Sequence, residues 1–315
     1  MAGSDANRPL VRVICGPTAS GKTHAATLCA AFANIAVVSA DSRQVYRRFD
    51  VGTAKPTPGE RSAAPHYGID VLEPTQRASA AWWAQEADGW IRDAEAQDRI
   101  PVVVGGTGLY LRALFGELFE EPPMDPVRRM ALQAGLDELS VDELRRWVTA
   151  LDPARASLGR TQLLRAVEVA LLTGQRVSDL HRERRTVPRW SARYLVVDPG
   201  AGLHDLIAAR TRRMLAAGWA DEVRALMETV PETAPAWNAS GYRTVRAMVQ
   251  GELSIDDAEE RVIIETRQYA KRQRTWFRHQ LADADVTRLD PRAAGFEGAL
   301  RRWWEGDGAG EGVGA

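Results

Sequence analysis

The sequence predicts an α/β protein, with a parallel sheet flanked by helices and one helical insertion domain. Three apolar segments, residues 11–15, 35–39 and 100–104, have the length and β-branched composition of buried strands. Helical stretches at residues 24–33 and 79–96 alternate with these strands, which is typical of a parallel sheet covered on both faces.

The middle of the chain, residues 117–188, is rich in helix signals and poor in strand signals. Asp125-Pro126 is a typical helix start, with an N-cap acid followed by proline in the first turn. Ser140 and Glu143 have the spacing of a capping box, and Gly174 is placed to end a helix expected over residues 163–172. We therefore expect a helical insertion here.

Strand character returns at residues 194–198, and residues 203–282 again have helical composition. The expected domains are thus an α/β core, residues 1–116 with 189–305, and the insertion, residues 117–188. The Gly/Ala/Glu-rich tail, residues 306–315, is expected to be disordered.

The composition is that of a soluble globular chain, with 45% hydrophobic and 26% charged residues among 315. A net charge of −1 excludes an overall basic character, so any nucleic-acid contact requires local clusters of basic residues. Residues 1–8 lack the apolar core of a secretory signal, and no apolar run reaches the roughly 20 residues of a membrane span. Cys15 and Cys29 lack metal-ligand spacing and are expected to be buried, reduced thiols. We expect a cytoplasmic protein.

Residues 16–23, Gly-Pro-Thr-Ala-Ser-Gly-Lys-Thr, match the pattern G-x-x-x-x-G-K-[ST] between a strand and a helix. The glycines let backbone N–H groups point at phosphate oxygens, and the following helix adds its positive N-terminal end. Lys22 supplies a full charge and the Thr23 hydroxyl a ligand for Mg²⁺. The motif predicts a P-loop NTPase-like sheet that binds a phosphate-bearing ligand, and nucleotides such as ATP belong to that class.

The acid that ATPases and GTPases usually carry at the end of an apolar strand is absent from residues 102–107, where the strand ends in Gly-Gly-Thr. Asp198 is an alternative, although the adjacent Pro199 favours an ordinary strand end. Asp41 follows the second strand, and we expect it beside the P-loop at the carboxyl edge of the sheet. There it could accept a proton from an attacking nucleophile, or serve only as a turn or N-cap aspartate.

Six segments together resemble the tRNA dimethylallyltransferase (isopentenyl-tRNA transferase) family. They are residues 16–23, 40–46 (Ala-Asp-Ser-Arg-Gln-Val-Tyr), 50–56 (Asp-Val-Gly-Thr-Ala-Lys-Pro), 105–110 (Gly-Gly-Thr-Gly-Leu-Tyr), 241–243 (Gly-Tyr-Arg) and 267–273 (Arg-Gln-Tyr-Ala-Lys-Arg-Gln). Each is modest evidence, but their order along residues 11–278 is specific. The resemblance implies transfer of a dimethylallyl group from its diphosphate to N6 of the adenosine beside the tRNA anticodon. A carbon-transfer reaction of this kind does not need a water-activating acid.

The resemblance also implies roles for individual residues. Asp41 is the expected catalytic base, with Lys22 and Thr23 assisting catalysis and Thr23 holding Mg²⁺. The expected diphosphate-binding residues are Gly16, Thr18, Ala19, Ser20, Gly21, Lys22, Thr23 and Arg210. The expected tRNA-binding residues are Asp41, Ser42, Arg43, Gln44, Thr107, Arg129, Thr161, Gln162, Arg165, Gly241, Tyr242, Arg243, Lys271 and Arg272. The implied partners are dimethylallyl diphosphate and the tRNA anticodon stem-loop. We expect the protein to be a monomer that does not bind a membrane.

The sequence departs from the family pattern at residues 158–162. The usual turn before the Arg-Ala-x-Glu helix is shortened, and Thr161-Gln162 replaces a Gln-Arg pair. This change affects tRNA positioning rather than the chemistry, and Arg160 or Gln162 could compensate.

A basic stretch lies between residues 261 and 278. It contains Arg261, Arg267, Lys271, Arg272, Arg274 and Arg278, with Tyr269, Trp276 and Phe277 interleaved. Phosphate contact and base stacking are the functional interpretation, and a solvated basic helix face is the alternative.

Three other functions fit parts of the pattern. A small-molecule kinase also combines a P-loop with an aspartate after the second strand, but would require ATP. An enzyme that prenylates free adenine nucleotides would not need the insertion or the basic stretch. A tRNA-binding module without catalysis would not need Lys22, Thr23 and Asp41.

Overall fold

The computed structural model describes residues 8–116, 122, 124–183, 188–281 and 285–306. The chain divides into two compact units, one made of residues 1–115 and 189–315 and the other of residues 116–188. Of the tail expected to be disordered, residues 307–315 lie outside the described residues.

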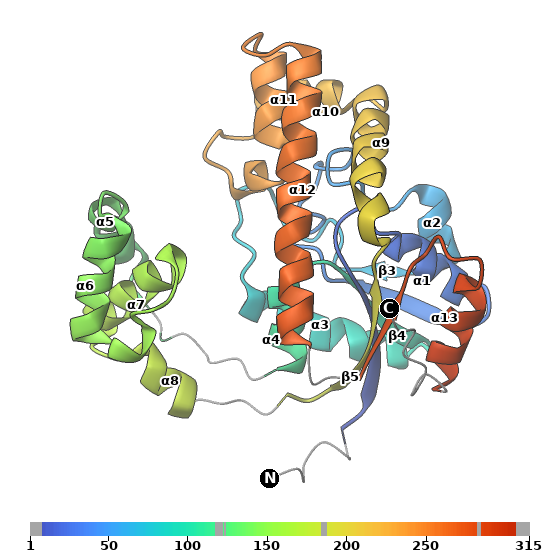
Figure 1. Cartoon of the computed structure of the whole chain (residues 1–315), viewed down its shortest axis with the longest axis horizontal. Helices are drawn as coiled ribbons and strands as arrows, with labels where there is room; N and C mark the ends of the chain where they lie inside the picture. Colours follow the sequence, from blue (N-terminus) through green and yellow to red (C-terminus); the bar gives the residue numbers. More distant parts are fainter. Residues whose placement is uncertain (1–7, 117–121, 123, 184–187, 282–284, 307–315) are drawn as a thin grey trace. The chain divides into compact units, whose positions relative to one another are not determined.

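The first unit contains a six-stranded parallel sheet with the strand order β3-β2-β4-β1-β5-β6 (Figure 1). Its strands are β1 (Leu10–Cys15), β2 (Ile35–Ser39), β3 (His66–Tyr67), β4 (Ile100–Gly105), β5 (Ser191–Val197) and β6 (Val286–Leu289). The predicted α/β fold with a parallel sheet is therefore confirmed. The short edge strands β3 and β6 were not predicted, because segments of two and four residues carry little periodicity.

β4 lies between β2 and β1 in the sheet, so that Val103 pairs with Val38 on one side and with Val13 on the other. β2, the strand that Asp41 follows, is therefore separated from the P-loop strand β1 by β4. The central position suits β4 because its β-branched residues are buried on both faces of a parallel sheet.

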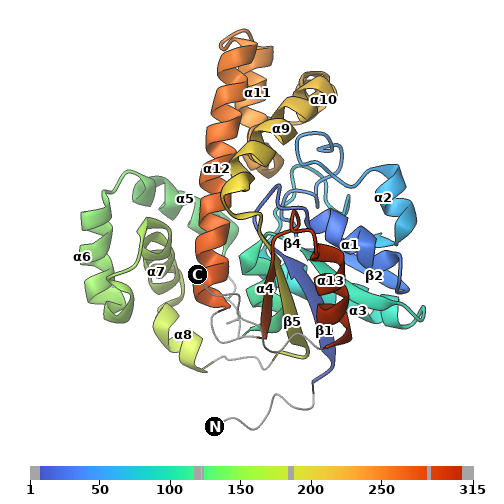
Figure 2. The ribbon, with the colours of Figure 1, turned by 45° about the vertical axis from the view of Figure 1, so that its right-hand side comes forward.

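Helices cover both faces of this sheet. The helices described in this unit are α1 (Lys22–Ala30), α2 (Pro58–Ala63), α3 (Ala80–Glu95), α4 (Gly108–Phe115), α9 (Leu203–Ala216), α10 (Trp219–Thr229), α11 (Tyr242–Val249), α12 (Ile255–Gln280) and α13 (Phe296–Glu305). On one face α1 and α13 pack together around Leu300 and Trp303 (Figure 2). On the other, Trp83 from α3 and Phe277 from α12 belong to the larger core.

The long helix α12 contacts α9, α11 and α4 and passes close to the carboxyl edge of the sheet (Figure 1). Ser254 caps it, Asp256 and Asp257 lie in its first turn, and basic residues lie in its last turn. Both charge placements complement the helix dipole. The predicted helical character of residues 203–282 is thus confirmed for α9–α12.

The second unit is helical: α5 (Pro126–Asp137), α6 (Val141–Leu151), α7 (Arg160–Thr173) and α8 (Val177–Glu183). Asp125 caps α5, Ser140 and Glu143 form the predicted capping box of α6, and Gly174 ends α7 in a left-handed conformation. Leucines of α5, α6 and α7 form its core.

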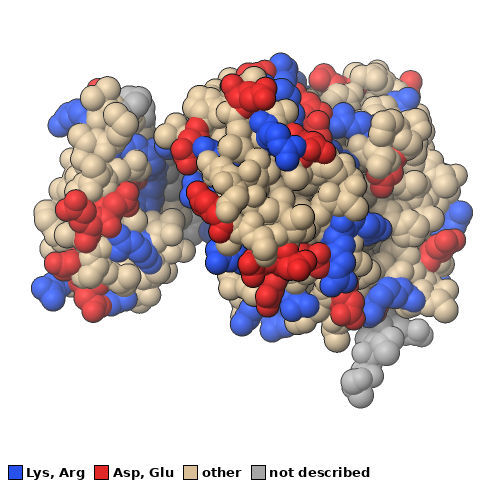
Figure 3. Space-filling model, turned by 90° about the horizontal axis from the view of Figure 1, so that it is seen from above, with Lys and Arg blue, Asp and Glu red and all other residues tan. Residues whose placement is uncertain are grey.

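Within the described residues, no helix combines the length and apolar character needed to cross a membrane. Cys15 and Cys29 are buried free thiols, as predicted, and burial raises the pKa of each to about 12. Basic and acidic side chains are interspersed on the face shown in Figure 3, in keeping with the small net charge.

Candidate active site

The loop between β1 and α1 forms the wall of a cavity of about 700 Å³ at the carboxyl edge of the sheet. Residues 18–23 line this cavity. Gly21, the residue before α1, is in the left-handed region at φ 92°, and no side chain caps the helix. The first N–H groups of α1 are therefore left for a bound anion.

Lys22 is half-buried in this wall and its Nζ donates to the carbonyl of Pro17 at 2.7 Å. Burial lowers the pKa of Lys22 to about 8; the charge of Asp41 opposes this shift and the charge of Arg210 adds to it. A half-buried ammonium with one carbonyl partner is under-solvated. A phosphate oxygen in the cavity would supply the missing negative charge.

Arg210 comes from α9 and lines the same cavity. Its Nη1 donates to Oγ1 of Thr18 at 3.1 Å, and burial lowers the pKa of the guanidinium. Because Arg210 occupies a lone pair of the Thr18 hydroxyl, the hydroxyl proton is left to donate to a ligand. The structure thus brings together Thr18, Lys22 and Arg210, three of the predicted diphosphate-binding residues.

The remaining predicted diphosphate residues form the backbone of the loop. Gly16 approaches the carbonyl of Val197 so closely that a Cβ would lie 2.2 Å from that oxygen. Ala19, Gly21 and Thr23 line the cavity together with Ser20, whose buried Oγ has no partner among the described residues.

Asp41 lies at the junction of two cavities, the large one and a second of about 60 Å³, which also share Thr18 and Arg210. Its Oδ1 accepts from the backbone N–H groups of Arg43 at 2.8 Å and Gln44 at 3.4 Å. Asp41 therefore does form the turn considered as an alternative. Since Oδ2 has no bond from any described group, the same carboxylate also keeps a free acceptor.

The glycine at the end of β4 explains how Asp41 reaches the P-loop although β4 separates their strands. A Cβ on Gly105 would lie 2.1 Å from the carbonyl oxygen of Ala40. Only a residue without a side chain fits between the two loops, so the position that carries an acid in ATPases is a spacer here.

Asp198, the other candidate acid, is bound to Arg274 of α12. Arg274 donates from Nε to Oδ2 of Asp198 at 2.9 Å, and its Nη2 contacts Oδ1 and the carbonyl of Gly200. Because both carboxylate oxygens of Asp198 bind Arg274, the structure supports the interpretation of Asp198 as an ordinary residue at the end of a strand. It also argues against the expected contact of Arg274 with RNA, because the guanidinium already has internal partners.

The small cavity is lined by Arg43, Ser240, Thr266 and Tyr269 in addition to the shared residues. Burial raises the pKa of Tyr269 to about 12, and a hydrogen bond with Thr107 opposes the shift. Oγ1 of Thr107 accepts from the N–H of Ser42 at 3.0 Å, next to Asp41. Ser42, Arg43 and Thr107, all predicted RNA contacts, are therefore neighbours at this site.

Gln44 contacts its own loop, where its Nε2 donates to the carbonyls of Thr53 at 3.3 Å and Ala54 at 3.1 Å. Lys55 also stabilises the loop formed by residues 41–57. Its buried Nζ binds the carbonyl of Tyr46 at 2.6 Å and pairs with two aspartates, Asp50 and Asp70. Lys55 therefore anchors the segment that carries Asp41.

Tyr242 was expected to bind tRNA, but its side chain is fully buried. Its hydroxyl donates to Oε1 of Glu222 at 2.6 Å, and Oε2 of the same carboxylate accepts from the N–H groups of Asp50 and Val51. Direct contact of Tyr242 with RNA is therefore wrong. Tyr242 braces the loop that holds Lys55 instead.

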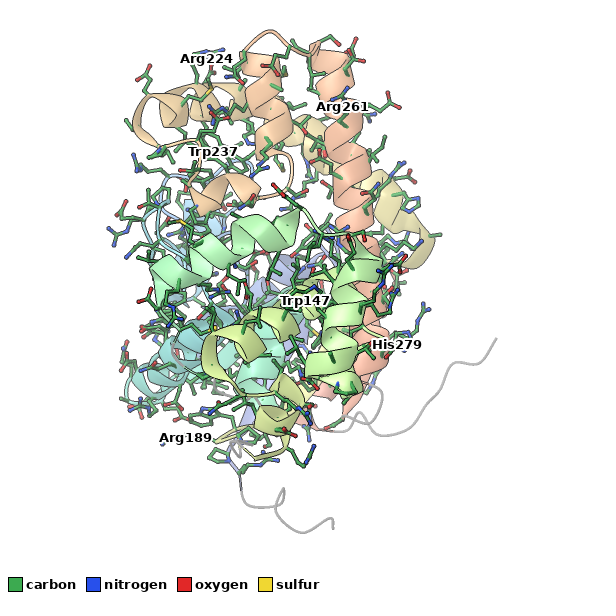
Figure 4. The ribbon with its side chains drawn as sticks, turned by 90° about the vertical axis from the view of Figure 1, so that its left-hand side faces the viewer. Trp147, Arg189, Arg224, Trp237, Arg261 and His279 are labelled. Atoms are coloured by element: carbon green, nitrogen blue, oxygen red, sulfur yellow. The ribbon has the colours of Figure 1, made fainter. Side chains whose placement is uncertain are left out.

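Gly241 and Arg243, the two residues that flank Tyr242 and were also expected to bind tRNA, differ in exposure. The N–H of Gly241 donates to Oε2 of Glu265 at 3.2 Å, and exposed Arg243 donates to Asn238 at 2.7 Å. Lys271 and Arg272 are exposed on α12. Figure 4 shows Arg261 and His279 toward opposite ends of the same helix.

In the helical unit, the predicted RNA residues Arg129 and Arg165 converge on Glu168, whose side chain is only 5% exposed, at 3.3 Å and 2.7 Å. Thr161 and Gln162 are exposed on α7. Arg160 donates to the carbonyls of Asp137 and Leu139 at the end of α5. Arg160 is therefore held inside its own unit, which removes it as the suggested replacement for the missing pair.

The described residues contain no group of three or more His, Cys, Asp or Glu side chains able to hold a metal ion. The Thr23 hydroxyl has no hydrogen-bond partner in the described part of the chain and so keeps its lone pairs for a cation. Mg²⁺ usually binds through one or two protein groups and substrate phosphates. The residues present therefore fit a Mg²⁺ that arrives with a diphosphate.

The family model described as IPP transferase matches residues 44–280 of this chain, and the model described as isopentenyl transferase matches residues 9–65. A tRNA dimethylallyltransferase of Deinococcus radiodurans is 40% identical over 302 residues, which cover 93% of this chain and 97% of the relative.

Two solved structures are also similar to the chain. The tRNA isopentenylpyrophosphate transferase of Staphylococcus epidermidis superposes with a TM-score of 0.66 at 29% identity, covering 95% of this chain and 99% of that one. A eukaryotic dimethylallyltransferase that acts on tRNA superposes with a TM-score of 0.80 at 22% identity, covering 97% and 81%. The second likeness bears on the fold alone.

Proposed function

The chain belongs to the IPP transferase family and is a prenyl transferase, and from this premise we propose the reaction that its site performs. A dimethylallyl group moves from dimethylallyl diphosphate to N6 of the adenosine on the 3′ side of the tRNA anticodon, and pyrophosphate is released. The observation that carries this proposal is the position of Asp41, at the junction of the P-loop cavity and a second cavity.

In this proposal Asp41 acts on the acceptor. The lone pair of N6 is delocalised into the adenine ring, so the amine is a poor nucleophile. Oδ2 of Asp41 accepts a hydrogen bond from N6 and then its proton, while Oδ1 stays fixed by the N–H groups of Arg43 and Gln44. The new N6–C1 bond forms as the bond between C1 and the bridging oxygen breaks.

The electron pair of the broken bond stays on the bridging oxygen of the diphosphate. Lys22, Arg210 and the N-terminal N–H groups of α1 stabilise the charge that develops there, and the Thr18 hydroxyl donates to the same group. Thr23 would hold a Mg²⁺ that neutralises part of the diphosphate charge. The reaction uses the P-loop without ATP hydrolysis.

Exposed residues on α12 supply phosphate contacts to the anticodon stem-loop in this proposal, with Lys271 and Arg272 as the principal pair. The target base already lies in a loop, so moving it into the small cavity costs only a few kcal/mol. We further propose that the protein works as a cytoplasmic monomer.

Mass spectrometry of nucleosides tests the proposal directly. The enzyme is incubated with dimethylallyl diphosphate, Mg²⁺ and a synthetic anticodon stem-loop with adenosine after the anticodon. The expected product carries a five-carbon prenyl group on that adenosine, and a matched stem-loop with guanosine at the position stays unmodified.

Two further incubations separate the rival functions. Prenylation of AMP in preference to the stem-loop would replace tRNA by a free nucleotide as the acceptor. Phosphorylation of a metabolite from ATP, with no prenyl transfer to RNA, would make the protein a kinase. Neither result is expected, because the family match covers residues 44–280 and includes the basic helix α12.

A further inference from the structure

One face of α12 packs against the loop that follows β4. Tyr269, Gln273 and Trp276 lie at positions i, i+4 and i+7 of the helix and therefore on the same face. Tyr269 bonds Thr107 and Gln273 bonds Gly106. At Gly108 a Cβ would lie 2.2 Å from the ring of Trp276, so the helix and the loop are in direct contact.

Gln273 extends this contact to the P-loop. Its side chain is buried, its Oε1 accepts from the N–H of Thr18 at 2.8 Å, and its Nε2 donates to the carbonyl of Gly106 at 2.8 Å. A backbone N–H faces one end of the amide and a carbonyl faces the other. Only one orientation of the amide satisfies both groups.

Each loop held by Gln273 also carries a group of the proposed reaction. The Thr18 hydroxyl accepts a hydrogen bond from Arg210 in the wall of the large cavity, where the diphosphate of the donor is proposed to bind. Thr107, next to Gly106, receives the N–H of Ser42 beside Asp41. The Gln273 amide is thus a direct connection between the loop at the diphosphate and the loop that supports the base.

We propose that Gln273 is a positioning residue that fixes the donor loop at Thr18 relative to the acceptor loop at Gly106. This role rests on the proposed prenyl transfer. In-line attack requires C1 of the donor and N6 of the acceptor to approach within a narrow geometry, and a displacement of about 1 Å costs on the order of 10²-fold in rate. Gln273, which also lines the large cavity, sets that geometry by binding both loops.

The need for both ends of the amide distinguishes two substitutions. Gln273→Ala removes both bonds, so it loosens Thr18 as well as Gly106. Gln273→Glu keeps an acceptor for the N–H of Thr18 but, as a carboxylate, has no proton to donate to Gly106. We expect Gln273→Ala to weaken donor binding and to slow turnover, and Gln273→Glu to slow turnover with little effect on the donor.

Gln273→Glu should also recover when it is protonated, because a neutral carboxylic acid restores both an acceptor and a donor in the same shape. Burial raises the pKa of a carboxyl group, which brings this protonation toward neutral pH. The ratio of the Gln273→Glu rate to the wild-type rate should therefore rise as pH falls from about 8 to about 6. Taking the ratio cancels the pH effects that both enzymes share.

The experiment measures three quantities in the full-length enzyme. Calorimetry gives the affinity for pyrophosphate with Mg²⁺, single-turnover assays give the transfer rate and the KM for dimethylallyl diphosphate, and thermal melting gives stability. The matched control is Gln280→Glu, the same substitution two turns further along α12, where the side chain is exposed.

We expect about a 10²-fold slower transfer for both Gln273 variants, weaker pyrophosphate binding for Gln273→Ala alone, and wild-type behaviour for the control. Transfer by Gln273→Ala within about threefold of wild type overturns the proposal, since such a change is far below the cost of misalignment. A second pattern also overturns it: the transfer rate of each variant falls only in proportion to its folded fraction, the KM for dimethylallyl diphosphate is unchanged, and the ratio of the Gln273→Glu rate to the wild-type rate does not vary with pH. That pattern is expected of a purely structural residue. If wild type binds pyrophosphate but prenylates no RNA, the proposed reaction fails, while the pyrophosphate measurements still test the Thr18 connection.

Discussion

The sharpest test of the site is the isosteric substitution Asp41→Asn. Oδ1 of Asp41 is fixed by the N–H groups of Arg43 and Gln44, and an asparagine carbonyl oxygen keeps both bonds. The substitution therefore preserves the turn. It changes only the second oxygen, the acceptor, into an NH₂ group that cannot take a proton.

The expected loss follows from the role of that oxygen. A positioned general base is typically worth 10²–10⁴-fold, so we expect kcat to fall about 10³-fold, or about 4 kcal/mol in activation free energy. A secondary effect is also expected, because the charge of Asp41 raises the pKa of Lys22. Without it, the pKa of Lys22 falls below about 8 and donor binding weakens near neutral pH.

The assay separates these effects. Single-turnover transfer to the stem-loop at saturating donor and about pH 7 reports the chemical step, and fluorescence titration gives tRNA affinity separately. Asp93→Asn, the same change at an exposed position of α3, is the matched control. A kcat within about tenfold of wild type, below the usual range for a general base, would refute the assignment of Asp41.

Three further predictions follow from individual contacts. The pKa of Lys22 is about 8, so kcat/KM for the donor should fall tenfold per pH unit above about pH 8, because the neutral amine binds diphosphate weakly. Replacing Lys271 and Arg272 by alanine should reduce the salt dependence of tRNA binding by about one unit of slope per true phosphate contact, in filter-binding assays. Tyr242→Phe should lower the unfolding free energy by about 1.5–3 kcal/mol, because it removes a bond to the carboxylate of Glu222, and should leave tRNA affinity unchanged.

Each of these has a contrary outcome. A flat pH profile up to about pH 10, near the ordinary pKa of lysine, would mean that the pKa of Lys22 is not lowered in the free enzyme. An unchanged salt slope in this double variant would mean that Lys271 and Arg272 belong to a solvated helix face. Arg274→Ala is the control: because the Arg274 guanidinium pairs with Asp198, we expect its removal to leave the slope unchanged. Weaker tRNA binding by Tyr242→Phe without loss of stability would restore Tyr242 as an RNA contact.

The sequence by itself determined the features whose partners lie close along the chain. The P-loop, its strand and its helix fall within residues 10–30, and the caps at Asp125, Ser140 and Gly174 act over two to four residues. Periodicity and capping describe such contacts directly, so the α/β class, the helical insertion and the P-loop followed from the residues.

The tertiary structure decided everything that joins distant segments. The place of β4 between β1 and β2, and the glycine spacer it requires, depend on strand order, which local pattern does not encode. Arg274 looked like an RNA contact because its partner Asp198 lies far away in sequence. Tyr242 looked like an RNA contact for the same reason, since its partner Glu222 lies 20 residues away.

Gln273 is the clearest case, since its bond to Thr18 spans 255 residues. A glutamine in a basic helix has no local signal of burial, and its sequence neighbours Lys271 and Arg272 are exposed to solvent. A side chain acquires its role from the groups that folding brings to its two ends. The sequence indicates the P-loop and Asp41, and only the packing of α12 shows that one amide binds the loops at Thr18 and Gly106.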